Sequence, residues 1–302
     1  MATFDTWESY FYPETINPLT GSGTLRNLAE IRDPEMLRKY EYTATASRQR
    51  QLVTDPSLVS RTYDADHLQA IHGYLFQDVY KWAGQYRSVD MMKGRSQFAE
   101  VAGGIDRYLE DVHNLVESTP WQELDHDQFA TQSATVFAYL NQGHPFREGN
   151  GRTSKVFMNH VAEQSPYKLD FSQVTPDIWN QASMLSGPDL GKYEPMPDPL
   201  IPVFRAVSVQ RPQTQVSESQ SEGLGQNIKM DRNMDQQHGR SEVQQSVADR
   251  LSFLRGNNGS RLEAIRAQRR EQASQQPSRD ETEGLHRPQP IKEQDNSKYR
   301  GY

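Results

Sequence analysis

The stretch His144-Pro145-Phe146-Arg147-Glu148-Gly149-Asn150-Gly151-Arg152 is the most informative part of this chain. It places a histidine, a carboxylate, two glycines, an amide and an arginine in one short turn, and residues 153–163 are predicted to begin a helix. A glycine-rich turn that leads into a helix presents free backbone N–H groups and the positive end of the helix dipole to an anion. The stretch therefore predicts a phosphate-binding turn in a helical protein.

The side chains of this turn suit chemistry on a nucleotide phosphate. A histidine has an unperturbed pKa near neutrality, so His144 is the candidate to take a proton from an attacking hydroxyl. Because His144 precedes Pro145, we expect it in an extended conformation. Phe146 stands between polar neighbours and is expected to point into the core. Glu148 offers a hard oxygen ligand of the kind that Mg²⁺ prefers.

Several further residues are assigned to phosphate. Gly149 and Gly151 let the backbone approach an anion closely, and Asn150 can hydrogen-bond a phosphate oxygen. Arg152 brings a forked, permanently charged donor to the helix start, and Arg147 adds a second cation. A zinc site built from His144, Glu148 and His160 is the alternative. We disfavour it because the chain lacks the His-Glu-x-x-His arrangement on one helix face.

Outside the turn, helical periodicity dominates. Apolar residues recur at helical spacing over residues 68–82, 105–116, 129–140 and 156–161, and Thr175-Pro176-Asp177 is typical of a helix start. Gly84, Thr119-Pro120 and Gly143 are the expected ends of the first three, with Gly143 in a left-handed position. Residues 86–101 alternate around the turn Lys93-Gly94-Arg95-Ser96, which predicts a β-hairpin. The expected fold class is all-α with one hairpin.

Composition divides the chain near Arg205. All four tryptophans precede it, and residues 206–302 are rich in Gln, Ser, Arg, Glu, Asp and Asn. Such a segment cannot bury enough apolar surface to offset the entropy of ordering it. We expect a folded domain over residues 1–205 and a largely disordered tail over 206–302. Two short helices, marginal in a solvated tail or docked on a partner, are predicted from spaced apolar residues: Val243, Val247, Leu251, Leu254, Leu262 and Ile265.

Charge and composition exclude several classes. The chain has 33 Lys+Arg against 40 Asp+Glu, a net charge of -7, which argues against nucleic acid as a partner. It has no cysteine, so disulfides, iron–sulfur clusters and cysteine zinc sites are excluded. No signal peptide and no apolar run of membrane-spanning length is seen, so we expect a cytoplasmic protein without a membrane partner, with delivery to another cell left open.

The stretch HPFREGNGRTSK, residues 144–155, resembles the signature of the Fic family, His-x-Phe-x-(Asp/Glu)-Gly-Asn-Gly-Arg-x-x-Arg. The resemblance covers roughly residues 10–205. It implies a helical bundle with a hairpin flap, and transfer of AMP from ATP to a Ser, Thr or Tyr hydroxyl of a target protein. His144 would be the general base and Glu148 the Mg²⁺ ligand. The phosphate ligands would be Asn150, Gly151 and Arg152. Around Lys93 and Gly94, the flap would enclose the nucleotide and align the target by strand addition.

The chain departs from the family pattern in two respects. Lys155 stands where the second signature arginine is usual, on the helix face of Arg152, so we expect looser phosphate binding and weakened activity. The family's inhibitory motif, Ser/Thr-x-x-x-Glu before Gly or Asn, is missing, because the nearest match, residues 119–123, is followed by Leu124. The resemblance then implies inhibition by a separate small antitoxin. A related subgroup that phosphorylates its target has lysine at the position of Gly151, so this glycine favours AMP transfer.

A second hypothesis is a binding protein on a Fic scaffold. In that case Lys155 would be the catalytic defect, and the Gln- and Arg-rich tail would be the functional part of the protein. Transfer of another phosphate-linked group is a third possibility that the same loop chemistry permits. We favour the adenylyltransferase because His144, Glu148, Asn150 and Arg152 all match the signature.

Overall fold

The computed structural model describes residues 3–93 and 96–212, and this part of the chain is mostly helical. Its α-helices are α1 (Pro34–Thr54), α2 (Ala65–Phe76), α3 (Gly104–Ser118), α4 (His126–Gly143), α5 (Asn150–Ala162), α6 (Pro176–Leu185) and α7 (Ile201–Val207). Short 3₁₀ helices are η1 (Glu8–Tyr10), η2 (Pro13–Thr15), η3 (Pro56–Leu58), η4 (Trp121–Glu123) and η5 (Phe171–Gln173). The expected all-α class with a small antiparallel hairpin is confirmed.

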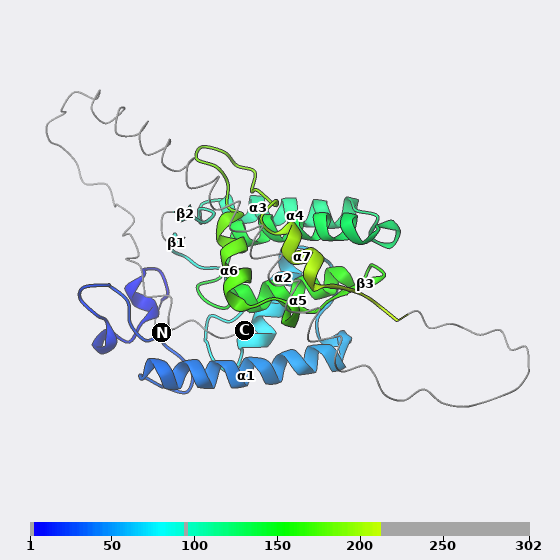
Figure 1. Ribbon diagram of the computed structural model, residues 1–302. Coiled ribbons are helices and arrows are strands. Elements are labelled where there is room, and N and C mark those ends of the chain that lie inside the picture. Colours follow the sequence, from blue (N-terminus) through cyan, green and yellow to red (C-terminus); the bar gives the residue numbers. More distant parts are fainter. Residues whose placement is uncertain (1–2, 94–95, 213–302) are drawn as a thin grey trace, which may run out of the picture.

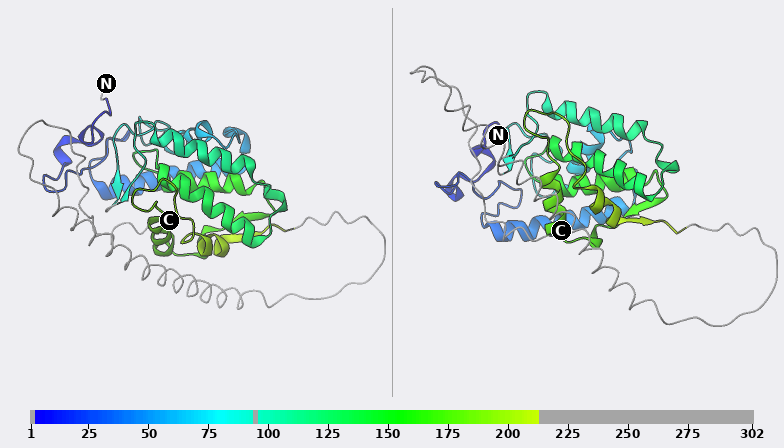
Figure 2. Two further views of the ribbon diagram at one scale, coloured as in Figure 1. Left: turned by 90° about the horizontal axis from the view of Figure 1, so that it is seen from above. Right: turned by 45° about the horizontal axis from the view of Figure 1, so that its top comes forward.

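The helices are stacked around α2 and α5 (Figure 1). The long helix α1 lies along one side and α3 and α4 along the other, with α2 and α5 between them. Seen from above and obliquely, α6 and α7 lie beside α4 and α5 (Figure 2), where α7 packs on α4. The central helix α5 is therefore packed on α2 and α4.

The predicted helix over residues 68–82 ends earlier than expected. Helix α2 stops at Phe76, although Val79, Tyr80 and Trp82 continue the buried apolar set. The chain instead turns back through Gly84, which has φ +80° and lies so close that a Cβ there would be 3.3 Å from the Gly73 Cα. The apolar pattern marks burial, and the close approach of two glycines decides where the helix ends.

The other predicted helices are confirmed with small changes. Helix α3 covers the second apolar stripe, and the Thr175 hydroxyl accepts a hydrogen bond from the Ile178 N–H at the start of α6. In α4, Gly143 is still helical and buried, with its Cα facing Tyr108; the left-handed residue is His144. The prediction of a left-handed Gly143 was therefore wrong by one residue.

The hairpin forms, but its strands are short. Strands β1 (Met92–Lys93) and β2 (Ser96–Gln97) are antiparallel, with Met92 opposite Gln97. A second pair, β3 (Tyr167–Leu169) and β4 (Ser208–Gln210), was not expected from the sequence. Because β4 and the end of α7 belong to the fold, the boundary at residue 205 lies too early. The tail helices predicted over residues 243–265 lie outside the described residues.

Helix α1 was also missed, because its buried face is only half apolar. It consists of Leu37, Glu41, Thr45 and Leu52, so hydrophobic periodicity alone does not reveal the helix. The start is nevertheless marked in the sequence, since the Asp33 carboxylate accepts a hydrogen bond from the Met36 N–H at 2.7 Å and Pro34 is the first helical residue. Within residues 3–93 and 96–212, no helix is long and apolar enough to cross a membrane.

Candidate active site

His144 forms the C-cap of α4 in a left-handed conformation, with φ 39° and ψ 57°. The predicted extended conformation was therefore wrong. Its N–H still bonds the Leu140 carbonyl at 3.3 Å, so the residue closes the helix and then reverses the chain. A left-handed non-glycine residue carries backbone strain and persists only where its surroundings hold it. The imidazole ring stacks on Phe98 of the hairpin, with centroids 3.8 Å apart and planes 9° from parallel.

Phe146 anchors the turn after His144 in the core, as predicted. The Phe146 ring is fully buried and stacks on His72 of α2 at 3.8 Å. Both backbone groups of Phe146 are bound by one side chain, that of Asn150. The Asn150 amide accepts from the Phe146 N–H at 2.9 Å and donates to its carbonyl at 2.7 Å. Asn150 thus fixes the turn through its side chain, a role not predicted from the sequence, and its role as a phosphate ligand stays a prediction.

His72 connects the turn to the α2–Gly84 region. The Gly84 N–H donates to His72 Nδ1 at 2.8 Å, so Nδ1 is the acceptor and the proton lies on Nε2. That Nε2–H donates to the backbone carbonyl of Glu148 at 3.0 Å. Burial lowers the pKa of His72 to about 3, which keeps the ring in this neutral tautomer. The histidine therefore acts as a fixed structural support beneath the turn.

Glu148 forms the partly exposed side of the turn, next to the buried Gly149. The Gly149 N–H donates to Glu148 Oε1 at 2.9 Å, and the same oxygen lies 3.5 Å from Arg152 Nη2. The Glu148 side chain keeps 42% of its surface exposed, so a metal ion and its water ligands have access to it. Gly149 has φ +84° and lies against the ring of Phe76, which leaves no room for a side chain.

Helix α5 begins at Asn150 and presents its first turn to this region. Gly151 is exposed, and a Cβ there would meet nothing within 4 Å, so the space beside the helix start is open. The Arg152 guanidinium lies 4.8 Å over the Phe76 ring and pairs with Glu41 of α1. The arrangement combines free helix N-terminal N–H groups, an arginine and a carboxylate, which is suited to a phosphate and a divalent cation.

The Fic/DOC family model matches residues 62–162. A probable protein adenylyltransferase of Sinorhizobium fredii, y4lH, is 36% identical over 187 residues, which span 58% of this chain and 90% of that protein. The chain belongs to the Fic/DOC family.

Two other relatives place the Fic domain in larger proteins. The protein adenylyltransferase VbhT of Bartonella schoenbuchensis is 33% identical over 180 residues, 59% of this chain, but these span only 36% of VbhT. Among solved structures, the N-terminal Fic domain of a VirB-translocated Bep effector from Bartonella quintana, with bound ADP, is 27% identical. It has a TM-score of 0.56 and covers 67% of this chain and 95% of the solved one.

Two cations predicted to bind phosphate lie elsewhere in this Fic domain. The Arg147 guanidinium is buried in an aromatic cage of the N-terminal segment, 3.9 Å over Trp7 and 5.0 Å over Phe11. Lys155 places its Nζ 5.2 Å from the Phe171 ring and 5.0 Å from the Trp179 ring, and burial lowers its pKa. Arg147 therefore anchors the N-terminal segment to the signature, and Lys155 packs on Phe171 of η5 and Trp179 of α6.

The structure describes only some of the predicted flap residues. Lys93 pairs with Ser96 in the hairpin register, and Gly94 lies outside the described residues. Sequence reasoning missed Arg87, which connects the flap to the Fic signature. Its buried guanidinium donates from Nε to the His144 carbonyl and from Nη1 to the Val89 carbonyl, each at 2.9 Å, and from Nη2 to the Ala99 carbonyl. A charged residue at the start of the predicted hairpin, residues 86–101, is the available sequence cue.

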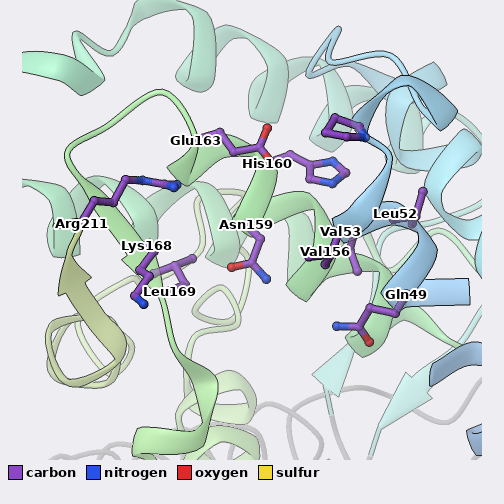
Figure 3. Close-up of a pocket in the computed structure, with 11 residues that line it drawn as sticks. Gln49, Leu52, Val53, Val156, Asn159, His160, Glu163, Lys168, Leu169 and Arg211 are labelled. Atoms are coloured by element: carbon purple, nitrogen blue, oxygen red, sulfur yellow. The ribbon is translucent and has the colours of Figure 1, made fainter. Parts of the chain in front are cut away.

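A pocket of about 300 Å³ lies away from the signature (Figure 3). It opens between α1, α5 and β3 and is lined by Leu52, Val156, His160, Lys168 and Arg211 among others, with no contribution from residues 144–152. His160 lies here, and its Nδ1 is 2.9 Å from Nε2 of His67. Among the residues that the structure describes, no three His, Cys, Asp or Glu side chains are grouped for a metal, so the zinc alternative has no support.

Proposed function

We propose that this protein is a Mg²⁺-dependent protein adenylyltransferase that transfers AMP from ATP to a Ser, Thr or Tyr hydroxyl of a target protein. The observation that carries the proposal is the exposed start of α5, framed by Glu148 and Arg152 and adjoined by His144 under the flap residue Phe98. The names of the Sinorhizobium and Bartonella relatives and the ADP in the Bartonella quintana neighbour support it.

The residues then divide the reaction between them. The target hydroxyl oxygen bonds the α-phosphorus of ATP, and the bond from this phosphorus to the oxygen that bridges to the β-phosphate breaks. His144 accepts the hydroxyl proton, and pyrophosphate leaves. Arg152 and the N–H groups of the α5 start bind phosphate oxygens. Such chemistry depends mainly on positioning and on neutralising charge, and these groups supply both.

Glu148 fits a magnesium ion. Mg²⁺ is usually bound by one or two carboxylates together with substrate phosphates and water. One partly exposed carboxylate next to an open phosphate site matches that pattern, and bound Mg²⁺ would neutralise part of the phosphate charge. Glu148 oxygens would hold it, and the hydrogen bond from the Gly149 N–H keeps that carboxylate oriented.

Target recognition and regulation belong to the same proposal. The short strands of the flap offer backbone groups to an added strand of the target, near the His144 ring. A separate small antitoxin would hold the enzyme in check, and the reaction would take place in the cytoplasm of the producing cell or of a recipient cell. Measuring growth of cells that express the protein with and without neighbouring small genes would test the antitoxin.

The decisive experiment uses two labels. The protein is incubated with a bacterial lysate, Mg²⁺ and ATP labelled at the α- or the γ-phosphate, with His144→Ala as control. We expect protein-bound label from the α-phosphate only, and none with His144→Ala. Label from the γ-phosphate alone would show a kinase instead. No label from either would contradict catalysis and favour the binding-protein hypothesis, in which Lys155 is the defect.

A further inference from the structure

Glu41 is a carboxylate in the middle of α1 that reaches the Fic signature from outside it. It lies 111 positions before Arg152, and its Oε1 accepts a hydrogen bond from Arg152 Nη2. The pair is largely enclosed, with 11% of the Glu41 side chain and 21% of the Arg152 side chain exposed. Thr45, one helical turn further along α1, accepts a bond from Arg152 Nη1 at 3.3 Å. Helix α1 therefore holds one edge of the guanidinium.

The other oxygen of Glu41 is held by Tyr80. The Tyr80 hydroxyl donates to Glu41 Oε2, and the Tyr80 ring is buried in a stack on Trp82 with centroids 4.2 Å apart. Burial and the Glu41 charge raise the pKa of Tyr80 well above its usual range, so this hydroxyl stays protonated and remains a donor. The Glu41 carboxylate is thus fixed at both oxygens before it meets Arg152.

This arrangement leaves part of Arg152 available. A guanidinium has five N–H donors, and the hydrogen bonds to Glu41 and Thr45 use two of them. The Phe76 ring lies 4.8 Å from the guanidinium carbon and restricts its tilt. Burial raises the pKa of the Glu41 carboxyl, and the charge of Arg152 opposes this shift. A fixed carboxylate on one edge and an aromatic ring on one face leave one orientation for the free donors.

We propose that Glu41, supported by Tyr80, is a positioning residue that holds the Arg152 guanidinium in the orientation that binds the phosphate chain of the nucleotide. This inference rests on the proposed function, because it takes Arg152 to be a phosphate ligand. Glu41 touches neither the phosphate nor the target; its effect on the reaction passes through Arg152.

The test compares two ligands that share the adenosine and differ in phosphate: AMPPNP with Mg²⁺, and adenosine. Dissociation constants are measured by calorimetry on the full chain for the wild type, Glu41→Gln, Tyr80→Phe and the control Glu35→Gln. Glu35 lies in the first turn of the same helix and pairs with the exposed Arg38. Glu41→Gln keeps the size of the side chain and one acceptor oxygen, replaces the other oxygen with an NH₂ donor and removes the charge.

We expect Glu41→Gln to weaken AMPPNP binding about tenfold, by analogy with the loss of a partner that orients a metal ligand, which costs about tenfold or more. Adenosine binding should stay within about twofold of the wild type, Tyr80→Phe should show a smaller loss of the same kind, and Glu35→Gln none. In an Arg152→Gln background, Glu41→Gln should weaken AMPPNP binding little further, since each change removes the same interaction, that between Glu41 and Arg152.

Three results would overturn the inference. Equal losses for AMPPNP and adenosine would show that Glu41 serves folding alone. Unchanged AMPPNP binding would show that Arg152 needs no such support, and tighter binding would show that Glu41 competes with phosphate for Arg152. Should Glu41→Gln fail to fold, Tyr80→Phe gives the same comparison. Because these are binding measurements, they stay valid if AMP transfer fails; a wild type with no preference for AMPPNP over adenosine would refute both proposals.

Discussion

Gly149→Ala provides a direct test of the turn geometry, because Gly149 is constrained by both its backbone and its neighbour. Its φ of +84° is unfavourable for alanine, and an added Cβ would overlap the Phe76 ring, with Cε1 at 3.0 Å and two other ring atoms closer still. A left-handed conformation costs an alanine about 1–2 kcal/mol. Overpacking against a buried ring adds about 1–3 kcal/mol. The expected loss of stability is their sum, roughly 2–5 kcal/mol.

Gly151→Ala is the matched control two residues further on. A Cβ at Gly151 meets nothing within 4 Å, and the residue is helical. Alanine is favoured over glycine in a helix by up to about 1 kcal/mol, so this variant should be unchanged or slightly more stable.

The assay is thermal unfolding followed by circular dichroism and calorimetry. For folded parts of this size, 1 kcal/mol shifts the melting temperature by roughly 2–4 °C, so Gly149→Ala should melt roughly 10 °C lower. If both glycine variants melted at the wild-type temperature, Phe76 would not close the space at Gly149 and the described turn would be incorrect.

Three other predictions follow from the same region. Arg87→Met leaves buried carbonyls of His144 and the flap without a donor, so urea unfolding should show a loss of about 3 kcal/mol; wild-type stability would contradict the role of Arg87. His72 has its pKa lowered from 6.5 to about 3, so its stabilising effect is complete above pH 6.5 and is lost as the pH falls toward 3. Urea titrations at about pH 7 and pH 4.5 should then show a smaller pH effect for His72→Gln than for the wild type, and equal effects would refute this. Phe98→Ala removes the ring stacked on His144 and should slow AMP transfer about fivefold, equivalent to ~1 kcal/mol of aromatic contact, with the melting temperature nearly unchanged; an unchanged rate of labelling would show that the stacking has no role.

The sequence predicted those features of the site that are contiguous in the chain. The turn over residues 144–152, the buried Phe146 and the helix that follows could be found because short-range order and residue type decide them. The conformation of His144 could not, since a local preference before proline was overridden by the cap at Leu140 and the bond from Arg87. The hydrogen bonds of the Asn150 side chain to the Phe146 backbone could not be predicted either, because they exist only once the turn over residues 146–150 has formed.

Long-range partners could not be predicted from one sequence. Glu41 and Arg152 meet only because α1 crosses the bundle beside α5, and nothing in the spacing of α1 marks Glu41 as a buried residue. The surroundings of Arg147 could not be predicted either: its charge suggested a phosphate ligand, and tertiary packing places its guanidinium over Trp7 and Phe11. The short strands β3 and β4 lack a pattern long enough to detect and form because the ends of α5 and α7 lie together.

The aromatic cage around Arg147 limits how far the chain can be shortened in a fragment that keeps its function. Trp7, Tyr10 and Phe11 all precede the segment that matches the family model, residues 62–162, and so does Glu41. A fragment cut to that segment would keep the whole signature and lose the rings that enclose one of its arginines and the carboxylate that binds another. Fragments for expression, and donor segments for grafting this turn into another scaffold, should therefore begin before Trp7.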